Sequence, residues 1–239
     1  MSKWKIAGIA VVFGVVIFGI IKMATSGNGS GARTYGQYER SILVDLARGI
    51  DFSKYDPDTM MEANEDMGGI GEKIRGEKDA PLTIYEYADY TCSHCANWQV
   101  KIEELLEKYP GKFKVVFRDF VLGYTNSVSS ASAANAAFLQ GYWEEFASLL
   151  FANQNEWYSL SGRALYNKFE EYLEVASEGK ADTKKFYADM KSEEVAKRLA
   201  FNIGFGSMID LQGTPTFRID GKKIELADML TTIEQRFQK

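Results

Sequence analysis

Cysteine and histidine are scarce in this chain of 239 residues, which has two cysteines and one histidine. Two thiols cannot form a framework of several structural disulfides, and no second cysteine pair completes a tetrahedral zinc site. Basic residues are not in excess either, because 28 Lys and Arg stand against 33 Asp and Glu, for a net charge of −5. With charges of both signs interspersed, a nucleic-acid-binding function is not expected. No internal repeat of the period found in solenoid proteins is present.

The scarce residues lie together, since the cysteines are Cys92 and Cys95 and the histidine is His94. Two thiols at this spacing can open and close as one disulfide. The preceding run Leu82–Tyr90 favours a β-strand, and the stretch from about Asn97 favours a helix. At a strand-to-helix junction, the unpaired N–H groups and the positive end of the helix dipole favour a thiolate at the first cysteine. The spacing therefore predicts a reactive dithiol.

The N-terminus contains a long uncharged apolar run at residues 6–21, with Lys3 and Lys5 before it and Lys22 after it. As a helix this run would span roughly 24 Å at about 1.5 Å per residue, slightly less than a bilayer core of about 30 Å. Flanking lysines can extend the span by reaching the head groups. We predict an uncleaved membrane anchor over residues 1–24, and the alternative is a cleaved signal peptide. Both export the rest of the chain, to a compartment where a dithiol can be held oxidised.

The remainder follows an order of strands and helices. Residues 25–68 are predicted to form a Gly/Ser-rich tether and an N-terminal extension, with a short amphipathic helix at 38–50. Beyond them we expect two strands, a helix, a strand, a helical block, a hairpin and a last helix. The strands are expected at about 70–74, 82–88, 113–120, 216–219 and 222–225, and the first and last helices at about 92–108 and up to Phe237. Asp220-Gly221 is a strong hairpin signal. Such a mixed sheet needs helices on both faces, so the fold class is α/β.

This order, with Cys-x-x-Cys opening the first helix and Thr214-Pro215 before the hairpin, resembles the DsbA-like branch of the thioredoxin superfamily. The resemblance covers roughly residues 70–239, and its specific pieces are residues 76–95, 140–143 and 213–217. It implies a bacterial thiol–disulfide oxidoreductase with a thioredoxin-like domain at 69–239 and a helical insertion at about 126–206. The alternative is a cysteine pair that arose by chance or is purely structural.

The resemblance assigns the roles of the two cysteines. Cys92, nearer the helix N-terminus, is the nucleophile, and Cys95 is the resolving thiol. The imidazole of His94 is expected to stabilise the Cys92 thiolate and so make the disulfide a stronger oxidant. The alternative is that His94 is an exposed polar helix residue. Members of this branch commonly have proline before this histidine, whereas this chain has Ser93.

Glu86 stands six residues before Cys92, where the family carries a buried acid. Strand alternation places its side chain opposite those of Tyr85 and Tyr87. A buried carboxyl there would have a raised pKa and could exchange a proton with Cys95. The alternative is a surface carboxylate on the strand.

The resemblance also implies that the bond between Thr214 and Pro215 is cis and faces the disulfide. The backbone of Thr214 would then be available to pair with an extended substrate segment, as in strand addition. The alternative is an ordinary turn proline before a strand.

We therefore expect a single-pass cell-membrane protein whose extracytoplasmic domain introduces disulfides into exported proteins that carry cysteine thiols. The resemblance implies reoxidation by a quinone-linked membrane partner of the DsbB type, and we expect no metal and no cofactor. A reductase or isomerase on the same scaffold is the close alternative. A tethered chaperone or binding module, in which the Cys-x-x-Cys is incidental, is the alternative from another class. The sequence gives no redox potential, substrate identity or oligomeric state.

Overall fold

The computed structural model of the chain describes residues 35–237. The predicted membrane anchor and the first part of the tether lie outside the described residues. Within the described residues no helix has the length and apolar character needed to cross a membrane. Residues 35–237 belong to one compact unit.

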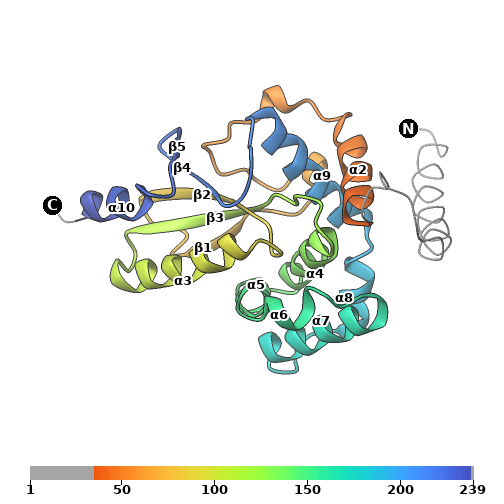
Figure 1. Ribbon diagram of the computed structural model, residues 1–239. Helices are drawn as coiled ribbons and strands as arrows, with labels where there is room; N and C mark the ends of the chain where they lie inside the picture. Colours follow the sequence, from red (N-terminus) through yellow and green to blue (C-terminus); the bar gives the residue numbers. More distant parts are fainter. Residues whose placement is uncertain (1–34, 238–239) are drawn as a thin grey trace. The chain divides into compact units, whose positions relative to one another are not determined.

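A five-stranded mixed sheet forms the centre of this unit, in the order β1-β3-β2-β4-β5 (Figure 1). The strands are β1 (Lys73–Gly76), β2 (Leu82–Ala88), β3 (Phe113–Asp119), β4 (Thr216–Ile219) and β5 (Lys222–Ile224). β2 and β3 are parallel and are connected by α3 (Ser93–Lys108), whereas the other neighbours are antiparallel. Asp220 and Gly221 have positive φ angles of 48° and 78°, as the predicted tight hairpin turn requires.

The first strand was predicted at about 70–74, but β1 begins at Lys73. The buried side chains of this strand are Lys73 and Arg75, which are 0% and 1% exposed. Hydrophobic periodicity cannot identify a strand whose buried face is charged. The other predicted strands agree with the structure to within one residue at each end.

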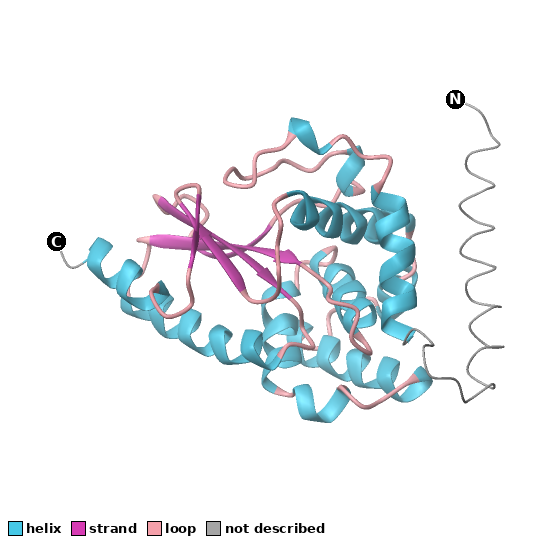
Figure 2. Ribbon diagram, turned by 45° about the horizontal axis from the view of Figure 1, so that its top comes forward, coloured by secondary structure: helices cyan, strands magenta, loops and turns pink. Residues whose placement is uncertain are grey.

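Side chains of β2 alternate between two cores, and helices cover both faces of the sheet (Figure 2). On the face of Ile84, β2 packs against α3 and against α10 (Met229–Phe237). On the opposite face, Tyr85 and Tyr87 pack against α9 (Glu193–Met208) through Phe201 and Phe205. The sheet is therefore buried on both sides, as its apolar strands require.

The helices between β3 and β4 occupy the predicted insertion and gather away from β5 and α10 (Figure 1). They are α4 (Ser127–Phe138), α5 (Trp143–Ala152), α6 (Gln154–Trp157), α7 (Gly162–Ser177), α8 (Thr183–Asp189) and α9. α4 is almost wholly buried and consists mainly of alanine and serine, whose small side chains allow close approach of neighbouring helices. The amide of Asn126 ties the start of α4 to the end of α6 by donating to the carbonyls of Tyr158 and Leu160.

The described part of the extension is not separate from the domain that was predicted to begin at residue 69. The extension forms α2 (Tyr35–Ala47) and two short 3₁₀ helices, η1 (Phe52–Lys54) and η2 (Glu65–Met67), which contact α9. Arg118 of β3 donates to the backbone carbonyls of Pro57 and Thr59, each at 2.9 Å. The extension therefore completes the cover of one sheet face.

Candidate functional site

Cys92 occupies the N-cap position of α3, where β2 passes into the helix. Its Sγ accepts a hydrogen bond from the backbone N–H of Cys95 at 3.4 Å. Cys92 is 8% exposed and Cys95 is fully buried, and both are free thiols in this structure. The predicted dithiol is therefore formed by one slightly exposed and one fully buried cysteine at a helix N-terminus.

The surroundings shift the pKa values of the two thiols in opposite directions. The pKa of Cys92 is lowered to about 5, first by the hydrogen bond from the Cys95 thiol, and further by Thr214 and by the backbone N–H groups of Cys95 and His94, which together outweigh burial. Burial raises the pKa of Cys95 far above the usual range, and its bond to Cys92 raises it further. At neutral pH Cys92 is thus a thiolate and Cys95 a thiol. A thiolate is the form that attacks disulfides.

The loop before β4 closes the site from the other side of the dithiol. The Thr214–Pro215 bond is cis, as the resemblance implied. Cys92 Sγ lies 3.4 Å from the carbonyl oxygen of Thr214 and donates to it as a thiol. The Thr214 hydroxyl oxygen is buried and has no hydrogen-bond partner. The structure therefore brings Thr214 to the nucleophile, while its pairing with a substrate stays a prediction.

Glu86 is fully buried in β2, so the alternative of a surface carboxylate is wrong. One carboxylate oxygen accepts a hydrogen bond from the side-chain amide of Gln99 at 2.6 Å, and the other has no partner. Burial raises the pKa of Glu86 to about 7, although the charge of Arg75 and the bond from Gln99 oppose this shift. The carboxyl can thus gain or lose a proton near neutral pH. Proton exchange with Cys95 stays a prediction.

Sequence reasoning missed Gln99, although its signal is local. Gln99 follows Cys95 by four positions in α3, and residues at this spacing share a helix face. The face that buries Cys95 therefore also carries Gln99 to Glu86.

The imidazole of His94 is exposed, and the structure records no hydrogen bond from it to Cys92. What His94 gives the nucleophile is its backbone N–H. The stabilising role expected of the ring stays a prediction.

Asp89 holds the segment that leads from β2 to Cys92. One of its carboxylate oxygens accepts bonds from the backbone N–H and the hydroxyl of Thr91, at 2.9 and 2.7 Å. The other accepts from the N–H of Leu122 and the hydroxyl of Ser127, at 2.7 and 2.8 Å. An aspartate that bonds the backbone two residues later is a turn signal that a sequence can show. Its bonds to Leu122 and Ser127 could not be predicted from the sequence.

A second side chain that the sequence did not identify comes from the helical insertion. The Nε2 group of Gln154, the first residue of α6, donates to the carbonyl of Tyr90 at 2.7 Å and to that of Cys92 at 3.0 Å. The insertion is thereby bonded directly to the backbone of the nucleophile.

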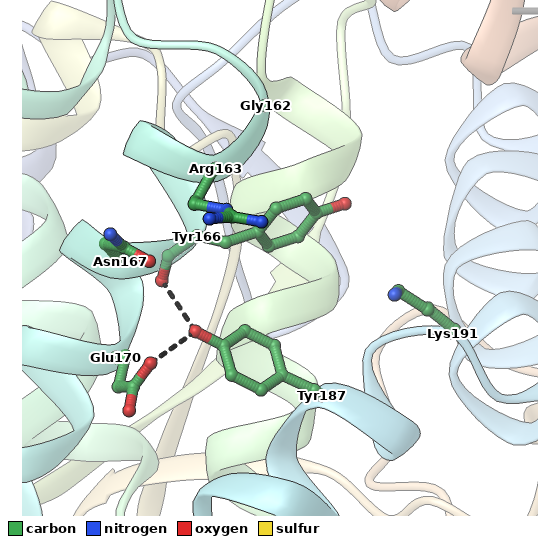
Figure 3. Close-up of a pocket in the computed structure, with 7 residues that line it drawn as sticks. All are labelled: Gly162, Arg163, Tyr166, Asn167, Glu170, Tyr187 and Lys191. Atoms are coloured by element: carbon green, nitrogen blue, oxygen red, sulfur yellow. Dashed lines mark hydrogen bonds between the residues drawn. The ribbon is translucent and has the colours of Figure 1, made fainter. Parts of the chain in front are cut away.

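A pocket of about 670 Å³ lies elsewhere, between α7 and α8 of the insertion (Figure 3). Its lining is formed by Gly162, Arg163, Tyr166, Asn167, Glu170, Tyr187 and Lys191. The Tyr187 hydroxyl bonds Glu170 at 2.6 Å and lies 3.3 Å from the Tyr166 carbonyl (Figure 3). The pocket contains neither cysteine, so the thiol chemistry lies outside it. Across residues 35–237, no group of three or more His, Cys, Asp or Glu side chains could hold a metal ion.

The chain matches a known protein family and is similar in sequence to known proteins. Residues 70–235 match the family model described as thioredoxin. The Na(+)/H(+) antiporter NhaA 3 of Salinispora tropica is 29% identical over 154 residues, which are 64% of this chain and 22% of the antiporter. The NhaA 1 antiporter of Mycolicibacterium gilvum is 29% identical over 158 residues, 64% of this chain and 24% of that protein. The similarity thus spans 22–24% of the length of these two relatives.

Solved structures resemble the chain over a larger share of their length. BdbD from Bacillus subtilis, in its oxidised form, aligns with a TM-score of 0.60 at 18% identity, over 77% of this chain and 100% of that chain. A protein-disulfide isomerase from Novosphingobium aromaticivorans gives 0.58 at 23% identity, over 70% and 98%. Wolbachia pipientis alpha-DsbA1 gives 0.56 at 23% identity, over 69% and 89%. At these identities the similarity establishes the fold.

Proposed function

Since the chain belongs to the thioredoxin family, we propose that it acts as a DsbA-like thiol–disulfide oxidase that introduces disulfides into exported proteins. The observation that carries this direction is the acidity of Cys92, whose pKa is lowered to about 5. A stabilised thiolate favours the reduced enzyme, which makes the corresponding disulfide a stronger oxidant.

In the proposed reaction the oxidised enzyme holds a Cys92–Cys95 disulfide. A substrate thiolate attacks Sγ of Cys92, the accessible sulfur, and the bond to Cys95 breaks. The electron pair goes to Cys95, which takes up a proton and becomes a buried thiol. A second substrate thiolate then attacks the substrate sulfur of the mixed disulfide, so that the substrate disulfide forms and Cys92 leaves as a thiolate.

Glu86 is proposed to deliver the proton that Cys95 takes up. Its burial and its pKa of about 7 support this role, because a carboxyl with such a pKa is protonated in part of the molecules at neutral pH. After release of the proton, the charge of Arg75 and the amide of Gln99 stabilise the carboxylate.

Catalytic turnover requires that the enzyme be oxidised again, and we propose a quinone-linked membrane partner of the DsbB type. The apolar run at residues 6–21 supports a location at the outer side of a cell membrane, with the anchor retained. Membrane fractionation with N-terminal sequencing tests this placement. A soluble form that begins near Gly27 would instead indicate a cleaved signal peptide.

The direction of the reaction is tested by equilibrating the full chain with glutathione buffers of known potential. We expect a reduction potential nearer about −120 mV, typical of strong oxidants, than about −270 mV, typical of reductases. A value near about −270 mV would assign the protein to the reductase alternative.

Activity and cellular function should be lost in Cys92→Ser, and their full retention would favour the chaperone or binding module. Cys95→Ser should accumulate mixed disulfides with substrate.

A further inference from the structure

Gln154 is the residue of the helical insertion that bonds the backbone on both sides of Thr91. Its Nε2 group donates to the carbonyls of Tyr90 and Cys92, at 2.7 and 3.0 Å. These residues lie more than sixty positions away in sequence. One amide group therefore fixes two carbonyls of the segment that carries the nucleophile into α3.

The position of these carbonyls decides how Cys92 presents its sulfur. The Cys92 carbonyl also accepts the N–H of Ala96 at 3.1 Å, which begins the hydrogen bonding of α3. The Sγ atom of the same residue accepts the N–H of Cys95 at 3.4 Å. A small rotation of the Cys92 backbone would lengthen this bond. The residue that holds the carbonyl consequently also holds the sulfur.

We propose that Gln154 is a positioning residue, which couples the helical insertion to the nucleophile by keeping Tyr90–Cys92 in the conformation where Sγ meets the helix N–H groups. Its donor group also places positive partial charge on the carbonyl side of the nucleophile. The use of the resulting thiolate rests on the proposed function, whereas the positioning itself does not.

The test is a thiolate titration of Cys92 in the full chain, followed by thiolate absorbance and by the rate of alkylation with iodoacetamide against pH. Gln154→Ala should shift the midpoint upward by about half a pH unit, which is the order expected for one hydrogen-bonding group. It should also make the disulfide less oxidising against glutathione, by about threefold in the equilibrium constant. Gln154 is half-buried, so the packed core loses little.

Two further variants separate positioning from a general effect on the insertion. Gln154→Glu keeps the size of the side chain, but a carboxylate cannot donate to the two carbonyls and adds negative charge beside the thiolate. It should shift the midpoint further than Gln154→Ala, and it carries the test if the alanine variant does not fold. Asn153→Ala is the matched control, because Asn153 donates to Leu149 within the insertion at 2.9 Å. Its midpoint should equal that of the wild type.

Unchanged midpoints in both Gln154 variants would overturn the proposal, and so would an equal shift in Asn153→Ala. Failure of the proposed oxidase function is recognised separately. A wild-type potential near about −270 mV would end that assignment, while shifted midpoints in the Gln154 variants would still support the positioning role.

Discussion

A charged side chain is buried on each face of the central sheet, Arg118 on one and Glu86 on the other, and these two residues differ in how far they are paired. On one face, every guanidinium nitrogen of Arg118 has a hydrogen-bond partner, and its ion pair with Glu72 measures 3.0 Å. On the opposite face, the carboxylate of Glu86 is bonded by Gln99 alone, and one oxygen has no partner. Both residues are fully buried.

This difference in pairing distinguishes Arg118, whose charge supports the fold, from Glu86, whose carboxyl can exchange a proton. Burial alone would lower the pKa of Arg118, but Glu72 and Tyr87 together more than compensate, so this pKa lies above its usual value and the charge is permanent. Burial raises the pKa of Glu86 to about 7, because its partners compensate incompletely. Incomplete pairing leaves a group that changes charge near neutral pH, which is what proton transfer needs. The contrast holds for this pair of residues, since Arg198 also bonds Glu72 yet keeps two unpaired nitrogens.

The largest effect is expected for substitution of Arg118. Arg118→Ala removes the ligand of two backbone carbonyls of the extension and leaves Glu72 with Arg198 as its ion-pair partner. Breaking a buried ion pair by removing one partner costs about 3–5 kcal/mol, and we expect the free energy of unfolding in urea to fall by that amount.

The Cys92 titration of folded Arg118→Ala should nevertheless match the wild type, because no contact joins Arg118 to the dithiol. Arg48→Ala is the control, since Arg48 forms an exposed pair with Asp45 and should change stability by about 0.5 kcal/mol or less. A shifted midpoint of the Cys92 titration in Arg118→Ala would show that Arg118 affects the dithiol, contrary to this prediction.

A smaller effect is expected at Glu86, and it depends on pH. The carboxyl ionises near pH 4.5 in the unfolded chain and near 7 in the folded protein, so the folded state holds a proton that the unfolded chain releases between these values. Stability therefore falls as pH rises through this window, by roughly 3 kcal/mol in total at about 1.4 kcal/mol per pH unit. Glu86→Gln should remove this fall, as urea unfolding at several pH values between 4 and 8 would measure.

Glu104→Gln is the matched control for this variant, because Glu104 is an exposed carboxylate on α3. It should keep the pH dependence of the wild type. If Glu86→Gln also keeps it, Glu86 ionises normally in the folded protein and the proposed proton donor is excluded. The exchange rate with a thiol substrate should lose its inflection near pH 7 in the same variant.

Some features of the site could be predicted from the sequence, whereas the start of the first strand could not. Cys92 and Cys95 were predictable, because a helix begins where its N–H groups are free. The buried position of Glu86 was implied by the family resemblance, since strand alternation alone left a surface carboxylate open. The start of β1 was not predictable, since Lys73 is paired inside the fold and interrupts the apolar pattern.

Contacts between distant segments left no signal of their own. Gln154 reaches Cys92 across sixty-two positions, and the distance between them is set by the packing of the insertion. The sequence likewise gives no indication that the extension covers Arg118 and accepts its hydrogen bonds. Period and motif identify the chemistry of this site, whereas its supporting residues depend on tertiary packing.

The smallest effects concern the two neighbours of Cys92 that differ in burial. The Thr214 hydroxyl oxygen is buried without a hydrogen-bond partner, and Thr214 contributes to the lowered pKa of Cys92. Thr214→Val keeps the shape of the side chain but removes the hydroxyl dipole near Cys92, and it should raise the midpoint of the Cys92 titration by about half a pH unit. His94→Ala should move it by about 0.3 units or less, because the imidazole is exposed and the contributing backbone N–H is retained. Alkylation rates against pH distinguish the two variants. A larger shift in His94→Ala than in Thr214→Val would support the imidazole as the group that stabilises the thiolate, and it would contradict a larger contribution from Thr214.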